Sequence, residues 1–61
     1  MILASYIYQD KHVIVFKRMH DGHEAICDTC SLPAKVAAAV AFMYGHNVRS
    51  LVVDGVAISR I

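Results

Sequence analysis

The stretch from Leu32 to Gly45 constrains the fold of this chain most, because it reads as a helix with a single charged residue, Lys35. The rest of the stretch is apolar or small. A helix on the surface of a small monomer needs one polar face. A helix that is apolar nearly all round, in a chain too short to wrap it, predicts a partner subunit. A second copy of the same chain is the simplest partner.

Length and composition support the same expectation. The 61 residues are expected to form one domain, 1–61, and a domain of this size buries only about 60% of its unfolded surface. Hydrophobic residues make up 57% of the chain, and charged residues make up 18%. Small scaffolds usually need disulfides, metals or oligomerisation, so this excess of apolar surface favours a homo-oligomer.

The charge pattern limits the classes of partner. The net charge is +1 and the six basic residues are scattered, whereas phosphate binding needs a basic stripe, so we do not expect nucleic acid as a partner. The longest apolar run, residues 36–44, is far shorter than the ~20 residues of a membrane span. Met1 leads into apolar residues without the basic segment of a signal peptide. We therefore expect a cytoplasmic protein, in the host cytoplasm if it is viral, with its two cysteines as free thiols.

Five segments rich in β-branched and aromatic residues are typical of strands. Turn signals separate them at Gln9–Lys11, at the Asp21–Gly22 pair and at the Asp54–Gly55 pair. The expected strands are Ile2–Tyr8, His12–Met19, Glu24–Asp28, Val48–Val53 and Val56–Arg60.

The helix has a start signal and a stop signal. Ser31 is expected as its N-cap, with Pro33 in the first turn, where proline is tolerated. The helix is expected to run to about Tyr44, with Gly45 as a left-handed terminator. The predicted element order is therefore βββαββ.

The strands are apolar on both faces. In the second strand, Val13 and Val15 alternate with Ile14 and Phe16. One helix covers only one face of a sheet, so the other face must meet a partner, or the sheet must curl strongly. We expect an α+β domain with an antiparallel sheet, one apolar helix packed on it, and a homodimeric assembly.

Small residues in the helix repeat at four-residue spacing, as Ala34 with Ala38 and Ala37 with Ala41. Such spacing permits close approach of a second helix. Alanine is also the best helix former, which explains the same residues without a partner. The sequence leaves both interpretations open.

The spacing of His20, His23, Cys27 and Cys30 resembles a zinc site, although it is not that of a standard finger. If residues 24–28 form a strand, the histidines and cysteines lie at opposite ends of it and cannot share one ion. We therefore expect no metal. If that segment is a loop instead, these four residues are the ligands.

Cys27 and Cys30 also precede the helix in a Cys-X-X-Cys arrangement. A helix N-terminus stabilises a thiolate, which is the basis of redox activity in such pairs. The chain is too short for a thioredoxin-like domain, and no aromatic-Gly-Pro context surrounds the pair. Small buried thiols are therefore the preferred interpretation.

A polar cluster is expected at one end of the molecule, because the strand directions bring three histidines together around Asp21, Arg18 and Tyr44. These histidines are His20, His23 and His46. Such a cluster suits anion binding or pH sensing, and ordinary loop surface is the other interpretation. The candidate binding residues are Arg18, His20, His23, Tyr44, His46 and Arg49.

The sequence contains no nucleophile–base–orienter constellation and no glycine-rich phosphate loop, so we expect neither enzyme activity nor a cofactor. Its size and element order match those of many small phage and mobile-element proteins that bind and block a host component. We expect a small homo-oligomeric inhibitor or regulator of viral type that blocks or sequesters a host protein.

The alternative function is a sponge for a small anionic, nucleotide-like ligand. Aromatic rings would stack on the base and arginines would hold the phosphate, in pockets at a dimer interface. The residues expected to line them are Tyr6, Tyr8, Tyr44, Arg18 and Arg49. A metal-binding or nucleic-acid-binding module is a weaker alternative.

Overall fold

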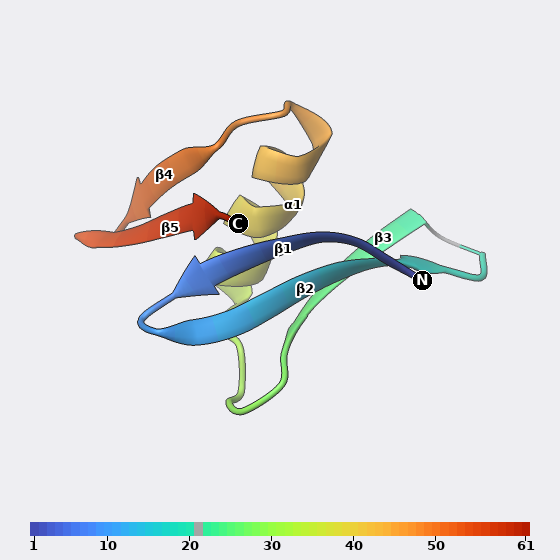
Figure 1. Ribbon diagram of the computed structural model, residues 1–61, viewed down its shortest axis with the longest axis horizontal. Helices are drawn as coiled ribbons and strands as arrows, with labels where there is room; N and C mark the ends of the chain where they lie inside the picture. Colours follow the sequence, from blue (N-terminus) through green and yellow to red (C-terminus); the bar gives the residue numbers. More distant parts are fainter. Residues whose placement is uncertain (21) are drawn as a thin grey trace.

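A five-stranded antiparallel sheet packs one helix against one of its faces in the computed structural model, which describes residues 1–20 and 22–61 (Figure 1). The order across the sheet is β3-β2-β1-β5-β4. The predicted α+β class and the βββαββ element order are confirmed. The elements are β1 (Ile2–Tyr8), β2 (Lys11–Arg18), β3 (Gly22–Cys27), α1 (Ala34–Gly45), β4 (Ser50–Val53) and β5 (Val56–Arg60).

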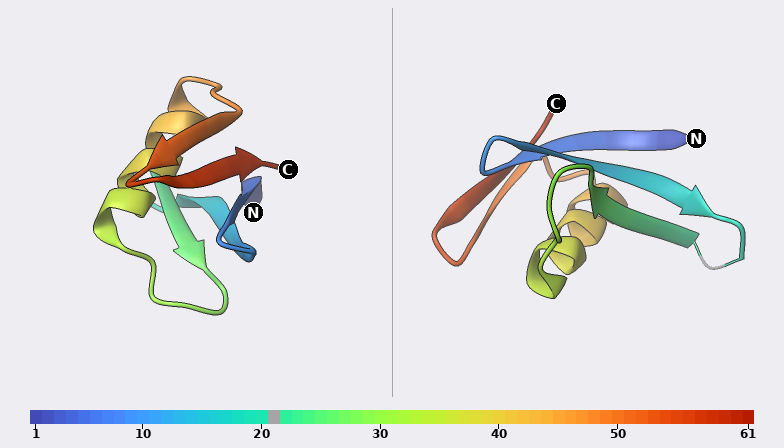
Figure 2. Two further views of the ribbon diagram at one scale, coloured as in Figure 1. Left: turned by 90° about the vertical axis from the view of Figure 1, so that its left-hand side faces the viewer. Right: turned by 90° about the horizontal axis from the view of Figure 1, so that it is seen from below.

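The sheet curls around the helix. In the right-hand view of Figure 2, β1 and β2 lie above α1, while β3 and the β4–β5 hairpin slope down on either side of it. Strands twist in one direction, so a sheet of this order can partly enclose a single helix on its concave side. The sequence offered a curled sheet or a partner for the second face, and the sheet is curled.

The core lies between the concave face of the sheet and one stripe of the helix. Val36, Val40 and Met43 follow the spacing of one helix face, and all three are buried. They meet Tyr6 and Ile58 from the sheet, which are both fully buried. The buried apolar side chains are Ala4, Tyr6, Val13, Val15, Val36, Val40, Met43 and Ile58.

The other side of the sheet, which we call the open face, is not covered by α1. Residues directly opposite one another in an antiparallel pair share a face, so Phe16 beside Ile2 and Ile14 beside Ile26 lie on it. Ile2 remains 58% exposed and Ile26 41% exposed. The apolar side chains of the open face are Ile2, Ile7, Ile14, Phe16, Ile26 and Val52.

The predicted start of the helix is wrong. The helix begins at Ala34, with Pro33 at the N-cap position and no side-chain capping bond, so Ser31 is not the cap. A proline disfavours the helical conformation of the residue before it. Leu32 therefore cannot belong to the helix, and the first turn begins one residue after the proline.

The predicted terminator is also wrong, since Gly45 is the last helical residue and Asn47 takes the left-handed conformation with a φ of 55°. The backbone N–H of Val48 donates to the Met43 carbonyl at 2.9 Å, and that of Asn47 donates to the Tyr44 carbonyl at 3.4 Å. This pair of bonds is the Schellman motif, which accepts asparagine when glycine is elsewhere. Because the Val48 N–H is bonded to the helix in this motif, β4 begins at Ser50 rather than at Val48.

Two tight turns close hairpins where the sequence predicts them. Gln9 and Asp10 have φ values of 49° and 60°, and Asp54 and Gly55 have values of 50° and 80°. Two successive left-handed residues form the type I′ turn that matches the twist of paired strands. At the third predicted turn, Gly22 has a φ of 95°, and Asp21 lies outside the described residues.

The first turn offers a stability test, because Gln9 and Asp10 adopt a conformation that costs a residue with a Cβ about 1 kcal/mol. We expect Gln9→Asn with Asp10→Gly, the favoured type I′ pair, to raise the free energy of unfolding by about 1 kcal/mol in urea denaturation. The matched control is Gly55→Ala. A Cβ at Gly55 would meet no atom within 4 Å, so its loss of about 1 kcal/mol comes from φ alone. An Asn-Gly variant no more stable than wild type would contradict this account.

Candidate functional site

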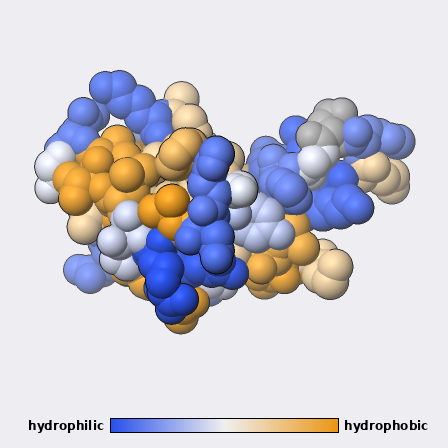
Figure 3. Space-filling view, turned by 90° about the horizontal axis from the view of Figure 1, so that it is seen from above, coloured by the Kyte–Doolittle hydropathy of each residue, from blue (hydrophilic) through white to orange (hydrophobic). Residues whose placement is uncertain are grey.

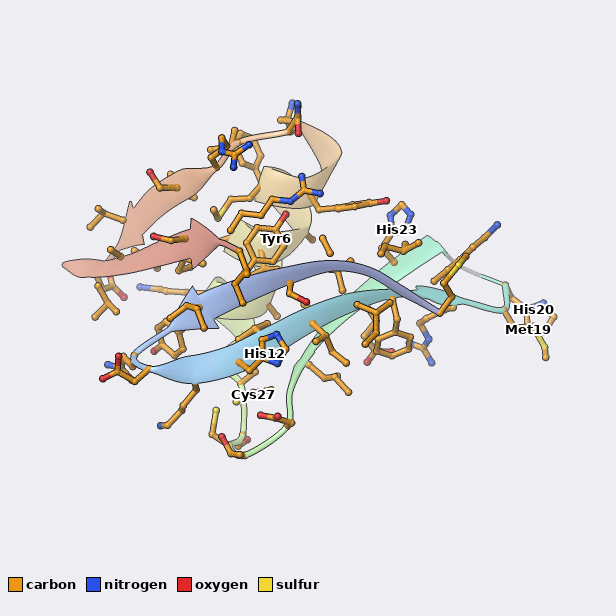
Figure 4. All side chains as sticks on the ribbon, in the orientation of Figure 1. Tyr6, His12, Met19, His20, His23 and Cys27 are labelled. Atoms are coloured by element: carbon orange, nitrogen blue, oxygen red, sulfur yellow. The ribbon has the colours of Figure 1, made fainter. Side chains whose placement is uncertain are left out.

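His23 and Tyr44 are the two predicted site residues that the structure brings into contact. His23 lies opposite Lys17 near the start of β3, on the helix side of the sheet. Its ring meets that of Tyr44 in the last turn of α1 edge to face, with centroids 4.8 Å apart at 71°. This contact joins the end of the helix to β3, where His23 is labelled in Figure 4.

Arg18 lies on the other side of the sheet. Its Nε is 3.2 Å from Oε2 of Glu24, and both side chains are half exposed. Arg18 shares the open face with Phe16, because the two residues alternate with the inward-pointing Lys17. An exposed ion pair of this kind contributes at most about 1 kcal/mol to stability. The expected cluster is therefore divided between the two faces.

His20 lies apart from His23 (Figure 4), and His46 contacts a different aromatic ring. His20 lies with Met19 at the end of the β2–β3 hairpin, which projects from the body of the molecule (Figure 4). Figure 3 shows this projection as mostly hydrophilic. The His46 ring instead packs on Phe42, one helical turn back, with centroids 4.3 Å apart. The expected meeting of three histidines does not occur.

Arg49 contributes its backbone to the sheet edge. Its carbonyl accepts a hydrogen bond of 2.8 Å from the N–H of Arg60, and its side chain is exposed. Nη1 of Arg60 donates to Oδ1 of Asn47 at 3.3 Å. Neither Arg49 nor Arg60 forms an ion pair with an acidic side chain among residues 1–20 and 22–61.

The geometry separates the cysteines from the histidines. Residues 24–27 belong to a strand, β3, and not to a loop. The four-residue step along this strand from His23 to Cys27 covers ~13 Å, so the histidines and the cysteines cannot share one metal ion. In the part of the chain that the structure describes, no three His, Cys, Asp or Glu side chains gather in a way that could hold a metal ion. The zinc-like spacing therefore has no common centre.

Cys27 and Cys30 form a separate cluster at the corner between β3 and α1. Both are half-buried and free. Sγ of Cys27 is 3.8 Å from Oγ1 of Thr29. The thiol of Cys30 donates to the sulfur of Cys27, which lowers the pKa of Cys27 and raises the pKa of Cys30. The Cys-X-X-Cys spacing predicts the pair, but the bend through residues 28–30 that positions Cys30 is not encoded in that spacing.

Tyr6, an expected ligand-stacking residue, is fully buried in the core. Its hydroxyl has no hydrogen-bond partner among the described residues. Desolvation by burial raises the pKa of this hydroxyl, partly offset by the Arg60 charge, and Tyr44 adds to the rise. The surface of the described residues carries no pocket. In the single chain, Tyr6 is therefore not available to stack on a ligand.

Comparison with known proteins identifies no relative: no family model, no curated protein and no solved structure matches the chain. Among the described residues, no helix has the length and apolar character needed to cross a membrane. The function proposed below is therefore argued from the positions of the candidate binding residues and of the apolar side chains.

Tyr6 offers a test of the core. We expect Tyr6→Phe to raise the free energy of unfolding by about 1 kcal/mol, because it removes a buried hydroxyl that forms no hydrogen bond. The effect should grow above pH 10. Burial raises the pKa of this phenol in the folded protein, so the unfolded state loses its proton first and wild-type stability falls as pH rises through that range.

The control for this comparison is Tyr8→Phe, because Tyr8 is only half-buried. It should change the free energy of unfolding by less than about 0.5 kcal/mol. Urea titrations at pH 7 and pH 10.5 measure both variants. A clear loss of stability in Tyr6→Phe would show that the hydroxyl has a partner in solution.

Proposed function

We propose that this chain is a non-enzymatic binding protein that works as a homodimer joined through the open face of the sheet. The observation that carries the proposal is the apolar content of that face. Ile2, Phe16, Ile14 and Ile26 form a continuous band across β1, β2 and β3. The helix lies on the opposite side, so no helix or strand among residues 1–20 and 22–61 covers this band (Figure 2).

The size of the open face suits a second copy. A standard interface removes about 800 Å² from each partner, or about a fifth of the 4104 Å² that this chain exposes. Figure 1 looks down the shortest axis of the molecule onto the open face, and the molecule extends 33 and 25 Å along its other two axes. A dimer closed through this face would therefore use one broad side of the molecule.

The charges at the edge of the band also favour a second copy. A twofold axis places one patch against the same patch of its partner. Arg18 and Glu24 stand side by side on the open face, so each protomer carries both signs. In a twofold pair, the arginine of one copy can meet the glutamate of the other. Two twisted sheets also pack well face to face, at about 30°.

The outer stripe of α1 is the competing surface. Ala34, Ala38, Ala41 and Phe42 are exposed along it. Three of these side chains are single methyl groups, which bury little apolar area compared with isoleucine. The open face therefore offers the larger gain on association.

The partner-binding residues are then those that the dimer leaves in solvent. His23 and Tyr44 lie on the helix side, and His46 and Arg49 are exposed beside the end of α1. Exposed polar residues beside loops are frequent sites of recognition. We propose that this surface binds a protein, as an inhibitor or regulator that blocks or sequesters a host component.

The dimer is tested by one charge on each surface. We expect wild type at 100 µM to have about twice the protomer mass of 6.7 kDa in sedimentation equilibrium. Ile26→Glu should weaken the dimer at least tenfold, or about 1.4 kcal/mol, because an unpaired charge would be buried. The matched control, Ala38→Glu, should keep the wild-type mass.

Each other outcome has a definite meaning. A monomeric wild type would overturn the dimer. Dissociation by Ala38→Glu but not by Ile26→Glu would place the interface on the helix. Circular dichroism of both variants must retain the wild-type spectrum, so that loss of mass is not loss of fold.

The class of ligand is tested by thermal unfolding with a panel of nucleotides. A sponge at a ligand concentration of 100 times Kd would gain about 2.7 kcal/mol, which corresponds to a rise of about 20 °C in Tm for a domain of this size. We expect no rise, because Tyr6 is buried and one protomer carries no pocket in its described residues. A rise of that size would favour the small-anion sponge over the protein-binding proposal.

A further inference from the structure

We propose that Cys27 and Cys30 form a thiol–disulfide exchange site, in which Cys27 attacks a low-molecular-weight disulfide and Cys30 resolves the mixed disulfide. This site goes beyond the binding function proposed above and does not depend on it. It stands on the geometry of the corner between β3 and α1, where Cys27 is labelled in Figure 4.

The sheet fixes the position of Cys27. It is the last residue of β3 and lies opposite the buried Val13 of β2. One residue further, the N–H of Asp28 still reaches the His12 carbonyl at 3.5 Å. The chain then bends through residues 28–30 before α1. Cys30 is the last residue of this bend, three residues after the sulfur that the strand holds in place.

Polar hydrogens surround the sulfur of Cys27. Oγ1 of Thr29 lies 3.8 Å from this sulfur. Hydrogen bonds from the Cys30 thiol and from the backbone N–H groups of Thr29 and Cys30 lower the pKa of Cys27. Successive backbone N–H groups in a tight bend form a concave site that stabilises an anion. A thiolate at Cys27 is therefore stabilised by the bend itself, although α1 begins only at Ala34.

The two thiols are not equivalent. The hydrogen bond from Cys30 lowers the pKa of Cys27, and the same bond raises the pKa of Cys30. Burial and the neighbouring Asp28 raise the pKa of Cys30 further, whereas Lys11 opposes the rise. The thiolate is the nucleophile in exchange reactions. Cys27, whose sulfur also lies 3.8 Å from the Thr29 hydroxyl oxygen, is therefore assigned as the attacking residue, and Cys30 as the resolving one.

The site is accessible to a small reagent. Both cysteines are partly exposed, and Asp28 and Thr29 between them are exposed. Cys27 shares the helix side of the sheet with Val13, so a dimer closed through the open face would leave the thiols free. In the described part of the chain, no three Cys, His, Asp or Glu side chains are arranged so that they could hold a metal ion, so we assign the pair to exchange.

The reaction balances without any further reactant. The Cys27 thiolate attacks one sulfur of the small disulfide, its S–S bond breaks, and the first small thiolate leaves with the bonding electrons and takes up a proton. Cys30 then loses its proton and attacks the sulfur of Cys27. The bond between Cys27 and Cys30 forms as the second small thiolate leaves. Two protein thiols are oxidised, and one disulfide is reduced to two thiols.

The test uses oxidised glutathione with the full chain at pH 7, followed by mass spectrometry of the intact protein. Wild type should lose two hydrogens and carry no adduct. Cys30→Ser should accumulate one glutathione adduct, at least ten times faster than Cys27→Ser does. Thr29→Val, which keeps the shape but loses the hydroxyl, should slow adduct formation in the Cys30→Ser background several-fold.

Two results would overturn the proposal. One is an equal adduct rate in Cys27→Ser and Cys30→Ser, which would show two ordinary surface thiols. The other is a wild type that accumulates adducts or disulfides between chains instead of the internal bond. Circular dichroism confirms the fold of each variant. If either serine variant fails to refold after purification under reducing conditions, alkylation by iodoacetamide gives a second measure of which of the two thiols reacts faster.

Discussion

The packing of one helix stripe against one face of the sheet is the contact on which the rest of the structure depends. Val36, Val40 and Met43 meet Val13 and the other buried side chains of the concave face. A single helix cannot cover both faces of a sheet whose strands are apolar on both sides. The sheet curls around the helix, which gives one face a core but leaves Ile2 and Ile26 in solvent. The apolar surface that remains exposed there is the physical basis for the proposed dimer.

The elements were predictable from local signals, and their ends were not. Strand composition and the Asp54–Gly55 turn each act within a few residues, so the sequence identifies them. The helix ends are decided by competing rules. Pro33 excludes Leu32 from the helix, which overrides the capping preference of Ser31. At the other end, Asn47 takes the left-handed conformation, and this allows the Val48 N–H to donate a hydrogen bond to the Met43 carbonyl.

The site was less predictable, because it depends on strand register. Arg18 and His23 are close in sequence and flank the same hairpin, yet they lie on opposite faces. Alternation along β2 contains this information, since Arg18 follows Phe16 by two residues and Phe16 lies on the open face. The contact of His23 with Tyr44 requires the helix to cross β3 at one place. Strand patterns alone do not specify that crossing.

The two proposals place their activities on different sides of the same sheet. The open face carries large apolar side chains and one ion pair, which suit a surface that closes on itself. The corner after β3 carries two thiols at the margin of the core, where Cys27 packs against the buried cluster. Because that packing holds the attacking sulfur still while the bend supplies polar hydrogens, the reactivity of Cys27 depends on β3 remaining folded. Loss of exchange on unfolding, with both cysteines still present, would separate this built site from the intrinsic reactivity of the Cys-X-X-Cys sequence.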